Sequence, residues 1–473
     1  MIQLSNPTRS LWALAALVGL TAVTAGIILA FGGPLAALAL LMAGAAAYVV
    51  LRNIELGFWG VILVISLLPF ATLPIDIGIT PTFLDLALAA VVGVWALRIV
   101  TGRQRAIITS PITVPLLIFI LIAVFAFIFG LANGPLTPTL LRKFAELILS
   151  ISFVIVIVDY ASSWERLERL VKVALLAGMA AAIIAIGLWL LPDESANSFL
   201  NALARLGYPG GWVIRYVEEN PALAERAIGT SVDPNVFGGF LVLLGSLAGP
   251  QLVAKRPLFP RWFTFLMVGA IFLALILTFS RGAMLGLAAG LGFVAVARYR
   301  RLLPYMLVGG ILLLLLPISQ EYMARFLEGF QGQDLATQMR FGEYKDALRL
   351  IQRYPMFGVG FAGTPDIDIY LGVASVYLTI AQTMGVVGLT AFFAVMATVF
   401  GYAFLNRQAF RNNERLDPIW IGLHAALIGA LVVGIFDHYL FNLVFQHAVA
   451  VFWLFVGLAV AATRLGQEAA GNR

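Results

Sequence analysis

Residues 262–298 read WFTFLMVGAIFLALILTFSRGAMLGLAAGLGFVAVAR. The stretch contains only two charged residues, Arg281 near its centre and Arg298 at its end. Its apolar halves, 262–279 and 282–298, each approach the length that a helix rising about 1.5 Å per residue needs to cross a ~30 Å hydrocarbon core. The stretch therefore predicts two membrane-spanning helices joined at a short segment that carries an arginine.

The same pattern repeats along the whole chain. Of 473 residues, 61% are hydrophobic and 11% are charged, whereas soluble domains average about 25% charged residues. The candidate spans are 11–31, 33–51, 56–72, 83–100, 112–132, 143–159, 168–191, 235–253, 262–279, 282–298, 302–318, 373–405, 419–436 and 441–463. We expect an all-α, polytopic transmembrane helix bundle of about 12–14 spans, the lower count applying if early short runs are re-entrant or interfacial. The run 11–31 is longer than the core of a signal peptide and is expected to be a retained first span.

Basic residues gather in four of the predicted loops. They are Arg98, Arg103 and Arg105; Lys255, Arg256 and Arg261; Arg298, Arg300 and Arg301; and Arg407, Arg411 and Arg415. With fourteen spans, all four loops share a side with both termini, and the positive-inside bias makes that side cytoplasmic. The net charge of +6 then reflects the basic residues of the cytoplasmic loops that orient the chain in the membrane, and we expect no nucleic-acid partner.

We expect five regions along the chain. They are N-terminal transmembrane helices (1–191), a first external loop (192–234), central transmembrane helices (235–318), a large external loop (319–372), and C-terminal transmembrane helices with a cytoplasmic tail (373–473). Both loops are expected to be folded. In the second, Phe341, Tyr344, Leu348 and Ile351 recur at helical spacing before Pro355, which predicts an amphipathic helix that either covers the bundle as a lid or lies in the lipid surface.

The composition excludes several kinds of chemistry. The chain has no cysteine, so disulfides, thiolate metal sites and cysteine nucleophiles are excluded. With only three histidines, His424, His438 and His447, a multi-histidine metal centre is not expected. We expect neither a metal nor a cofactor.

The short segment that joins the spans 262–279 and 282–298 is the most informative one. In Thr278–Gly286, Ser280 suits a helix N-cap and Arg281 would occupy the first turn. A guanidinium beside the positive end of a helix suits phosphate or pyrophosphate. The alternative is an arginine that reaches to lipid headgroups.

Three further segments reach the same predicted external face. One holds Arg226 and the turn Asp233-Pro-Asn235, which could bind a ligand or only cap a helix. The next holds Arg340 and, in 354–363, three closely spaced glycines that could admit a ligand or simply form a turn. In the last, Asp437 could orient His438 as a base, or the histidine could be structural. Arginines with nearby carboxylates indicate a site for an anionic ligand.

In order and spacing these motifs resemble the O-antigen ligase and polysaccharide polymerase superfamily of bacterial inner-membrane proteins. Ser280–Gly286 resembles its S-R-G-A-x-L-G signature, and Arg340 with Pro355–Gly360 resembles its external arginine and P-x-x-G-x-G turn. The segment 226–235 resembles its arginine-and-glycine stretch, and 377–389 resembles its following helix. The detailed resemblance covers about 224–457.

The resemblance implies a membrane glycosyltransferase that needs no metal. It would move a glycan from an undecaprenyl-pyrophosphate carrier to a glycan or lipid acceptor at the periplasmic face, with inversion at C1; ligase and polymerase both remain open. The implied substrate-binding residues are Arg226, Arg281, Arg340, Asp233, Asn235, Ser280 and Tyr377.

One departure affects the general base. Where the family commonly has a histidine, this chain has Ala374 and Ser375. We expect His438 with Asp437 to take the catalytic role, with Asp233, Asp366 and Asp368 as rivals. A transfer reaction that needs no dedicated general base is a further alternative. The competing classes are a transporter or flippase of an anionic lipid-linked or polysaccharide substrate, and a non-catalytic scaffold.

Overall fold

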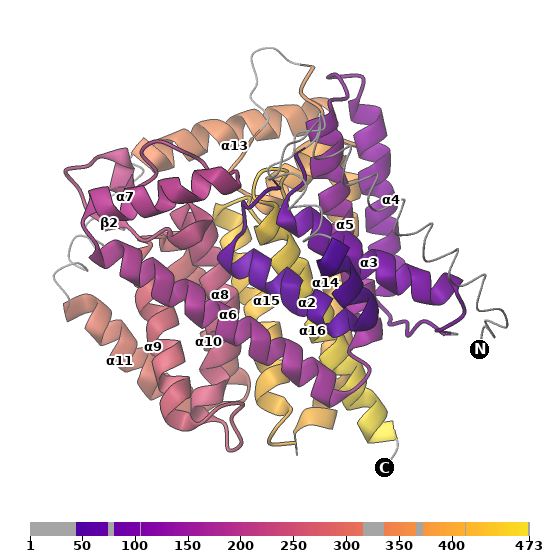
Figure 1. The fold of residues 1–473 in the computed structure, drawn as a ribbon, viewed down its shortest axis with the longest axis vertical. Coiled ribbons are helices and arrows are strands. Elements are labelled where there is room, and N and C mark those ends of the chain that lie inside the picture. Colours follow the sequence, from indigo (N-terminus) through magenta and orange to yellow (C-terminus); the bar gives the residue numbers. More distant parts are fainter. Residues whose placement is uncertain are drawn as a thin grey trace, which may run out of the picture.

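The structure, a computed structural model, describes residues 44–73, 80–104, 106–315, 335–365, 372–411 and 413–471. Over these residues the fold is an all-α polytopic bundle, as predicted (Figure 1). The predicted span 11–31, most of 33–51, and the candidate residues Asp366 and Asp368 lie outside the described residues.

The helices follow the apolar runs closely. The first are α2 (Ile54–Leu67), α3 (Phe83–Val100), α4 (Thr113–Gly130), α5 (Pro138–Tyr160), α6 (Trp164–Leu190) and α7 (Asp193–Ala202). The central ones are α8 (Pro234–Val253), α9 (Arg261–Leu277), α10 (Arg281–Ala297), α11 (Leu303–Leu315) and α13 (Leu335–Arg353). The last are α14 (Val376–Asn406), α15 (Asp417–Phe436) and α16 (Gln446–Gly471). Two short antiparallel strands, β1 (Arg215–Tyr216) and β2 (Glu225–Arg226), form the one sheet among the described residues.

Seven of the described helices are long and apolar enough to cross a membrane. They are α3, α4, α6, α8, α14, α15 and α16, while α2, α9 and α10 are shorter apolar helices. Large apolar side chains such as Val100 (84% exposed) and Leu121 (67% exposed) stand on the outside. This inside-out arrangement fits a lipid environment, where outward apolar groups carry no penalty.

Small residues let α10 pack tightly on α15. A Cβ at Gly286 would lie 2.8 Å from the Gly429 carbonyl oxygen, and one at Gly290 would lie 2.8 Å from that of Ala425. Only glycine at these two positions allows so close an approach of the two helices. The approach fixes the start of α10, and with it Arg281, against the helix that precedes Asp437.

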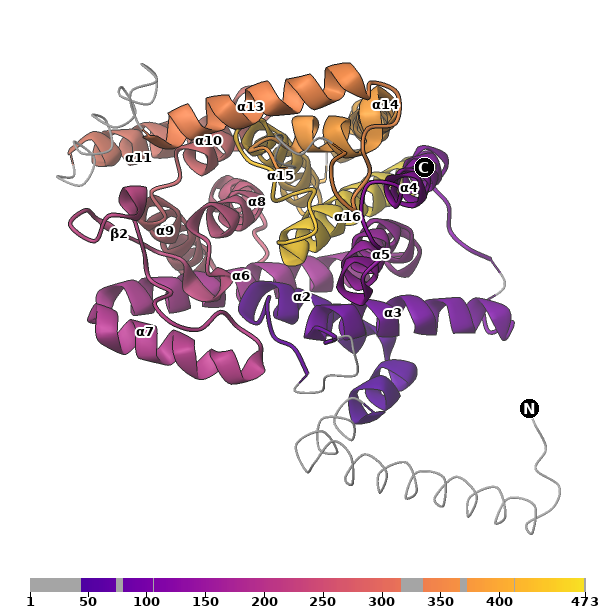
Figure 2. The same cartoon turned by 90° about the horizontal axis from the view of Figure 1, so that it is seen from above.

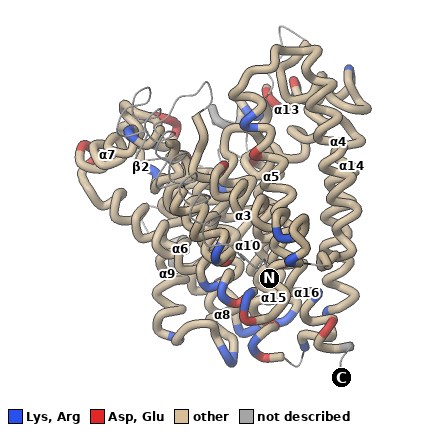
Figure 3. Tube along the Cα trace, turned by 45° about the vertical axis from the view of Figure 1, so that its right-hand side comes forward, with Lys and Arg blue, Asp and Glu red and all other residues tan. Residues whose placement is uncertain are grey.

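The two ends of the bundle differ in charge and structure. At one end, cationic side chains gather in the loops (Figure 3) and form ion pairs such as Arg298–Asp417 (2.6 Å) and Lys255–Glu414 (2.5 Å). At the other end, α7, β1 and β2 fold into a compact segment between α6 and α8, and α13 lies across the bundle (Figures 1 and 2).

The amphipathic helix α13 packs on the protein, mainly against α14. Its buried side is formed by Ala347 and Leu350, whereas Phe341 (59%) and Leu348 (50%) are exposed. Of the predicted apolar face, Phe341 and Leu348 point outward while Tyr344 and Ile351 are half-buried, and the structure favours the lid over a helix held only by lipid. Exposed phenylalanine and leucine remain compatible with contact to the bilayer along the lid's outer edge.

Candidate functional site

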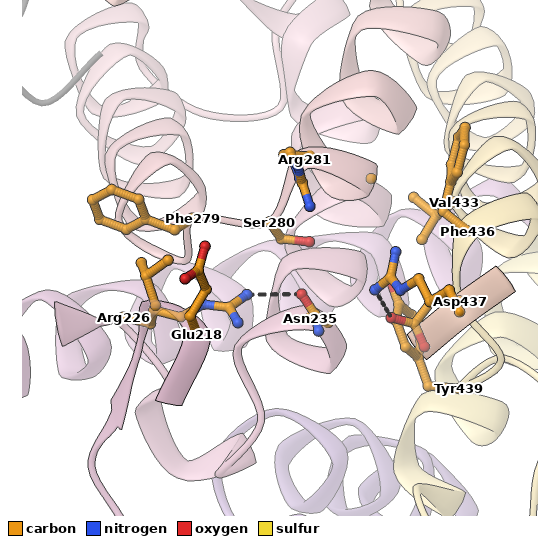
Figure 4. Close-up of a pocket in the computed structure, with 13 residues that line it drawn as sticks. Glu218, Arg226, Asn235, Phe279, Ser280, Arg281, Val433, Phe436, Asp437 and Tyr439 are labelled. Carbon is orange, nitrogen blue, oxygen red and sulfur yellow. Dashed lines mark hydrogen bonds and ion pairs between the residues drawn. The ribbon is translucent and has the colours of Figure 1, made fainter. Parts of the chain in front are cut away.

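A cavity of about 140 Å³ opens at the end covered by α13 (Figure 4). It is lined by Val217, Glu218, Arg226, Asn235, Phe279, Ser280, Arg281, Gly282, Arg340, Val433, Phe436, Asp437 and Tyr439. These residues come from the segment between α6 and α8, the α9–α10 turn, α13 and the end of α15. The three predicted arginines are therefore brought to one cavity.

Arg226 stands on β2 and is anchored to the α9–α10 turn and to α8. Its Nε donates to the Thr278 carbonyl at 2.8 Å, and an Nη donates to the Asn235 side-chain oxygen at 2.8 Å. The next backbone amide, that of Ala227, donates to the Leu277 carbonyl at 2.7 Å. The strand pair is thus bonded to the α9–α10 turn, which places Arg226 beside the segment that carries Arg281.

Ser280 and Arg281 occupy the positions predicted for them. The Ser280 hydroxyl accepts the Ala283 amide as the N-cap of α10, and Arg281 is the first residue of that helix. Both line the cavity, so Arg281 stands at a helix N-terminus that opens onto it. The arginine and the helix dipole act on the same space, an arrangement favourable to phosphate oxygens.

Asp233 has a capping role. Its carboxylate accepts the backbone amides of Asn235 (2.8 Å) and Val236 (2.9 Å), which begins α8. Burial raises the pKa of Asp233 above its usual range in spite of these bonds. Asn235 lines the cavity whereas Asp233 does not, so the structure separates two residues that the sequence groups together.

Asp437 joins the lid to the floor of the cavity. Its Oδ2 lies 3.7 Å from an Arg340 nitrogen, and its Oδ1 lies 2.8 Å from the His438 amide and 3.3 Å from His438 Nδ1. Burial lowers the pKa of His438, but the carboxylates of Asp437, Glu343 and Asp233 together outweigh it, so the net pKa is raised above 6.5. His438 does not line the cavity and reaches it only through Asp437.

The position where the family carries histidine is held by α13. The Glu343 carboxylate accepts the Ala374 amide at 2.9 Å, and the Tyr344 hydroxyl donates to the Ala374 carbonyl at 3.1 Å. Tyr377 is a structural neighbour of this point, because its hydroxyl donates to the Leu431 carbonyl at 2.7 Å and it does not line the cavity. Its predicted contact with substrate stays a prediction.

In the segment 354–363, the glycines at 358, 360 and 363 allow the turn to pack closely against neighbouring helices. Gly360 has a φ of +78°, and a Cβ there would lie 2.3 Å from Cα of Gly130 in α4. The turn is therefore pressed against a helix, which favours the simple turn over the ligand-approach alternative.

The structure adds a carboxylate that sequence reasoning missed. Glu218 lines the cavity, and both it and Phe279, also in the lining, have φ values above +50°. Among the described residues, the other non-glycine residues with positive φ are Glu219 and Val232, which adjoin Glu218 and Asp233. Such conformations cost about 1–3 kcal/mol each and cluster at functional sites.

Comparison with known proteins relates the central part of this membrane helix bundle to a protein family. Residues 263–393 match the sequence model of a family described as O-antigen ligase. The match runs from α9 into α14 and includes Ser280, Arg281 and Arg340. No curated protein matches the chain. Within the described residues, no group of three metal-binding side chains comes together.

Proposed function

We propose that this protein is a membrane glycosyltransferase of surface-polysaccharide assembly. It moves a glycan from an undecaprenyl-pyrophosphate carrier to a glycan or lipid acceptor, with inversion at C1 and without a metal. The observation that carries the proposal is the convergence of Arg226, Arg281 and Arg340 on one cavity from separate parts of the chain. The match to the O-antigen ligase family supports the same reaction class.

The elements β2 and α13, which carry the lining residues Arg226 and Arg340, lie at the end opposite the basic loops (Figure 3). The positive-inside bias assigns those loops to the cytoplasm of a bacterial inner membrane, so the proposal places the cavity on the periplasmic or external side. Both termini are then cytoplasmic. A carrier lipid can keep its chain in the outer leaflet while its diphosphate enters beneath α13.

The arginines would act on the leaving group. An acceptor hydroxyl oxygen attacks C1 of the glycan from the face opposite the carrier, and the bond between C1 and the diphosphate oxygen breaks. Its electron pair passes to the diphosphate, where guanidinium groups and the N-terminus of α10 stabilise the added charge. A carboxylate takes the acceptor's proton, leaving a new inverted glycosidic bond and the carrier diphosphate.

Two carboxylates among the lining residues are in a position to take that proton, Glu218 and Asp437. Asp437 lies close to Arg340 and to His438, and these contacts give both residues a role in positioning it. Glu218 enters from the opposite wall, beside the diphosphate-binding arginines in the lining. His438 with Asp437 stays the predicted catalytic pair, and Glu218 is a competing base.

The test is transfer in proteoliposomes. Purified protein is given an undecaprenyl-pyrophosphate oligosaccharide and candidate acceptors, and Arg226→Ala and Arg281→Ala are compared with the parent. Loss of one such charge-stabilising donor costs about 10²–10³ in rate. Each variant is expected to lose transfer by about 100-fold or more.

Arg215 supplies the matched control. It pairs with Arg226 across the two strands, but its side chain is exposed and bonded to Glu219 at 3.1 Å. Arg215→Ala removes the same charge from the same hairpin and should leave transfer within about twofold. Full transfer by the Arg226→Ala, Arg281→Ala double variant would refute the proposal.

A further inference from the structure

A second cavity lies at the basic end of the bundle and has no part in the proposed reaction. Its volume is about 230 Å³, larger than that of the first cavity. It lies where α3 and α5 end and α6 begins, and its lining includes the basic residues Arg98 and Arg166.

The one carboxylate in the lining is already occupied by neutral donors. Asp159 accepts from Trp95 Nε1 at 2.8 Å, from Gln104 Nε2 at 2.6 Å and from the Ile108 amide at 2.8 Å. None of these donors is a guanidinium. The carboxylate therefore organises the wall of the cavity without binding either arginine.

The two arginines keep donor capacity. Among the described residues, the Arg98 guanidinium has neither a hydrogen bond nor an ion pair, although the side chain is partly buried. Arg166 donates only from Nη1, to the Tyr160 carbonyl (3.2 Å) and the Ser162 hydroxyl (3.1 Å), within the same part of the chain. Planar guanidinium groups with open donors match the oxygens of a phosphate.

The surroundings of this cavity are those of a membrane surface. On α3, Leu97 is 50% exposed and Val100 is 84% exposed, so an apolar surface begins next to Arg98. Trp95 and Tyr160 line the cavity, and such residues concentrate at the level of lipid headgroups. A ligand with a phosphate head and acyl chains would meet both surfaces at once.

We propose that this cavity binds the phosphodiester headgroup of an anionic bilayer phospholipid, with Arg98 as the principal contact and Arg166 as the second. Basic pockets between transmembrane helices on the cytoplasmic side suit such headgroups. The same chemistry would accept free phosphate, which the experiment distinguishes. The inference is independent of the glycosyltransferase reaction.

The test measures lipid binding by the full chain. Native mass spectrometry counts phosphatidylglycerol and phosphatidylcholine bound to detergent-solubilised protein, for the parent and for Arg98→Ala. We expect a preference for phosphatidylglycerol and about tenfold weaker binding of it by the variant, the usual order of one charge-assisted contact.

Arg300 provides the matched control, because it is exposed at the same end and does not line the cavity. Arg300→Ala should bind phosphatidylglycerol like the parent. Equal losses in the two variants, or equal binding of both lipids by the parent, would overturn the proposal. Arg98-dependent protection from heat by inorganic phosphate, with no preference among lipids, would assign the site to free phosphate and overturn the lipid source.

A second measurement guards against a variant that fails to fold. Phosphatidylglycerol brominated on its acyl chains should quench the fluorescence of the parent more than that of Trp95→Phe, since Trp95 lines the cavity. Quenching that is identical in the two proteins would contradict binding at this position.

Discussion

The two ends of this protein use arginine in different ways. At the basic end, arginines and a lysine form ion pairs between loops, as in Arg298–Asp417 and Arg415–Glu168. At the cavity end, Arg226 is anchored by a backbone carbonyl and an asparagine amide. Arg340 at the same end forms a longer ion pair with Asp437, at 3.7 Å. The first arrangement joins loops through close ion pairs, and the second places guanidinium groups around a cavity.

This difference separates stability from function. The guanidinium groups of Arg226, Arg281 and Arg340 line a space that a ligand can enter, whereas those of Arg298 and Arg415 lie in close ion pairs. Backbone conformation follows the same division, because left-handed non-glycine residues of the described chain lie at or beside the cavity. Substitutions at one end should therefore change activity, and substitutions at the other should change folding.

The largest effect is expected from Glu218→Gln. The amide keeps the shape and backbone preference of the side chain but cannot take a proton, and loss of a general base costs 10²–10⁴ in rate. If Glu218 is the base, we expect kcat for glycan transfer to fall by about 100-fold with KM little changed, measured in proteoliposomes.

Glu219→Gln is the control for this prediction. Glu219 shares the left-handed conformation and the turn, but its side chain is exposed and pairs with Arg215. Its substitution should leave kcat unchanged. Normal kcat in Glu218→Gln would transfer the role to Asp437, and equal losses in both variants would indicate a folding defect of the turn.

A smaller effect, on stability, is expected at the basic end. The Arg298 and Asp417 side chains are 18% and 8% exposed and lie 2.6 Å apart. Arg298→Ala leaves a buried carboxylate with the Tyr299 hydroxyl as a remaining donor, so the free energy of unfolding should fall by about 2–3 kcal/mol. Lys255→Ala, which breaks an exposed pair, should cost less than about 0.5 kcal/mol.

These two variants are compared by unfolding in detergent and by transfer at a temperature where both are folded. Transfer should be close to that of the parent in each. A loss of transfer in Arg298→Ala without a loss of stability would contradict the division between the two ends.

The smallest effect concerns pH. Asp437 raises the pKa of His438, so the contact stabilises the folded protein fully below pH 6.5 and loses its effect as the pH rises through the raised value. In Asp437→Asn burial and the weaker influence of the Glu343 and Asp233 carboxylates would remain, and the pKa of His438 should fall. The stability gap between parent and variant should therefore shrink from pH 5 to pH 8, by less than about 1 kcal/mol because the histidine is one-third exposed. A gap that widens with pH would contradict this coupling.

The spans could be predicted because hydrophobic length alone determines them. The run 83–100 matches α3 at both ends, since Thr82 caps its start and Arg98 lies in its last turn. The run 143–159 begins late, because α5 starts at Pro138 and its first turns carry charged residues. The outward face of α13 was not predictable, because apolar periodicity cannot tell a core from lipid.

The site was predictable where a motif fixes local geometry. Ser280 and Arg281 stand as expected because an N-cap determines the first turn of a helix. Glu218 escaped prediction because its position depends on a left-handed turn with no glycine to mark it. His438 lies at the predicted end of the bundle but outside the cavity. Its side-chain direction was not predictable, because the direction of a loop side chain follows from its neighbours rather than from its own sequence.

The hydrogen bonds from Arg226 to Thr278 and from Ala227 to Leu277 cross the boundary of the segment that matches the family's sequence model. The matched segment begins at residue 263, yet an essential wall of the cavity is attached to it from outside that boundary. Grafting the matched segment alone onto another membrane scaffold would carry over Arg281 and Arg340 and leave Arg226 behind. The smallest transplantable unit runs from the β1–β2 hairpin onward.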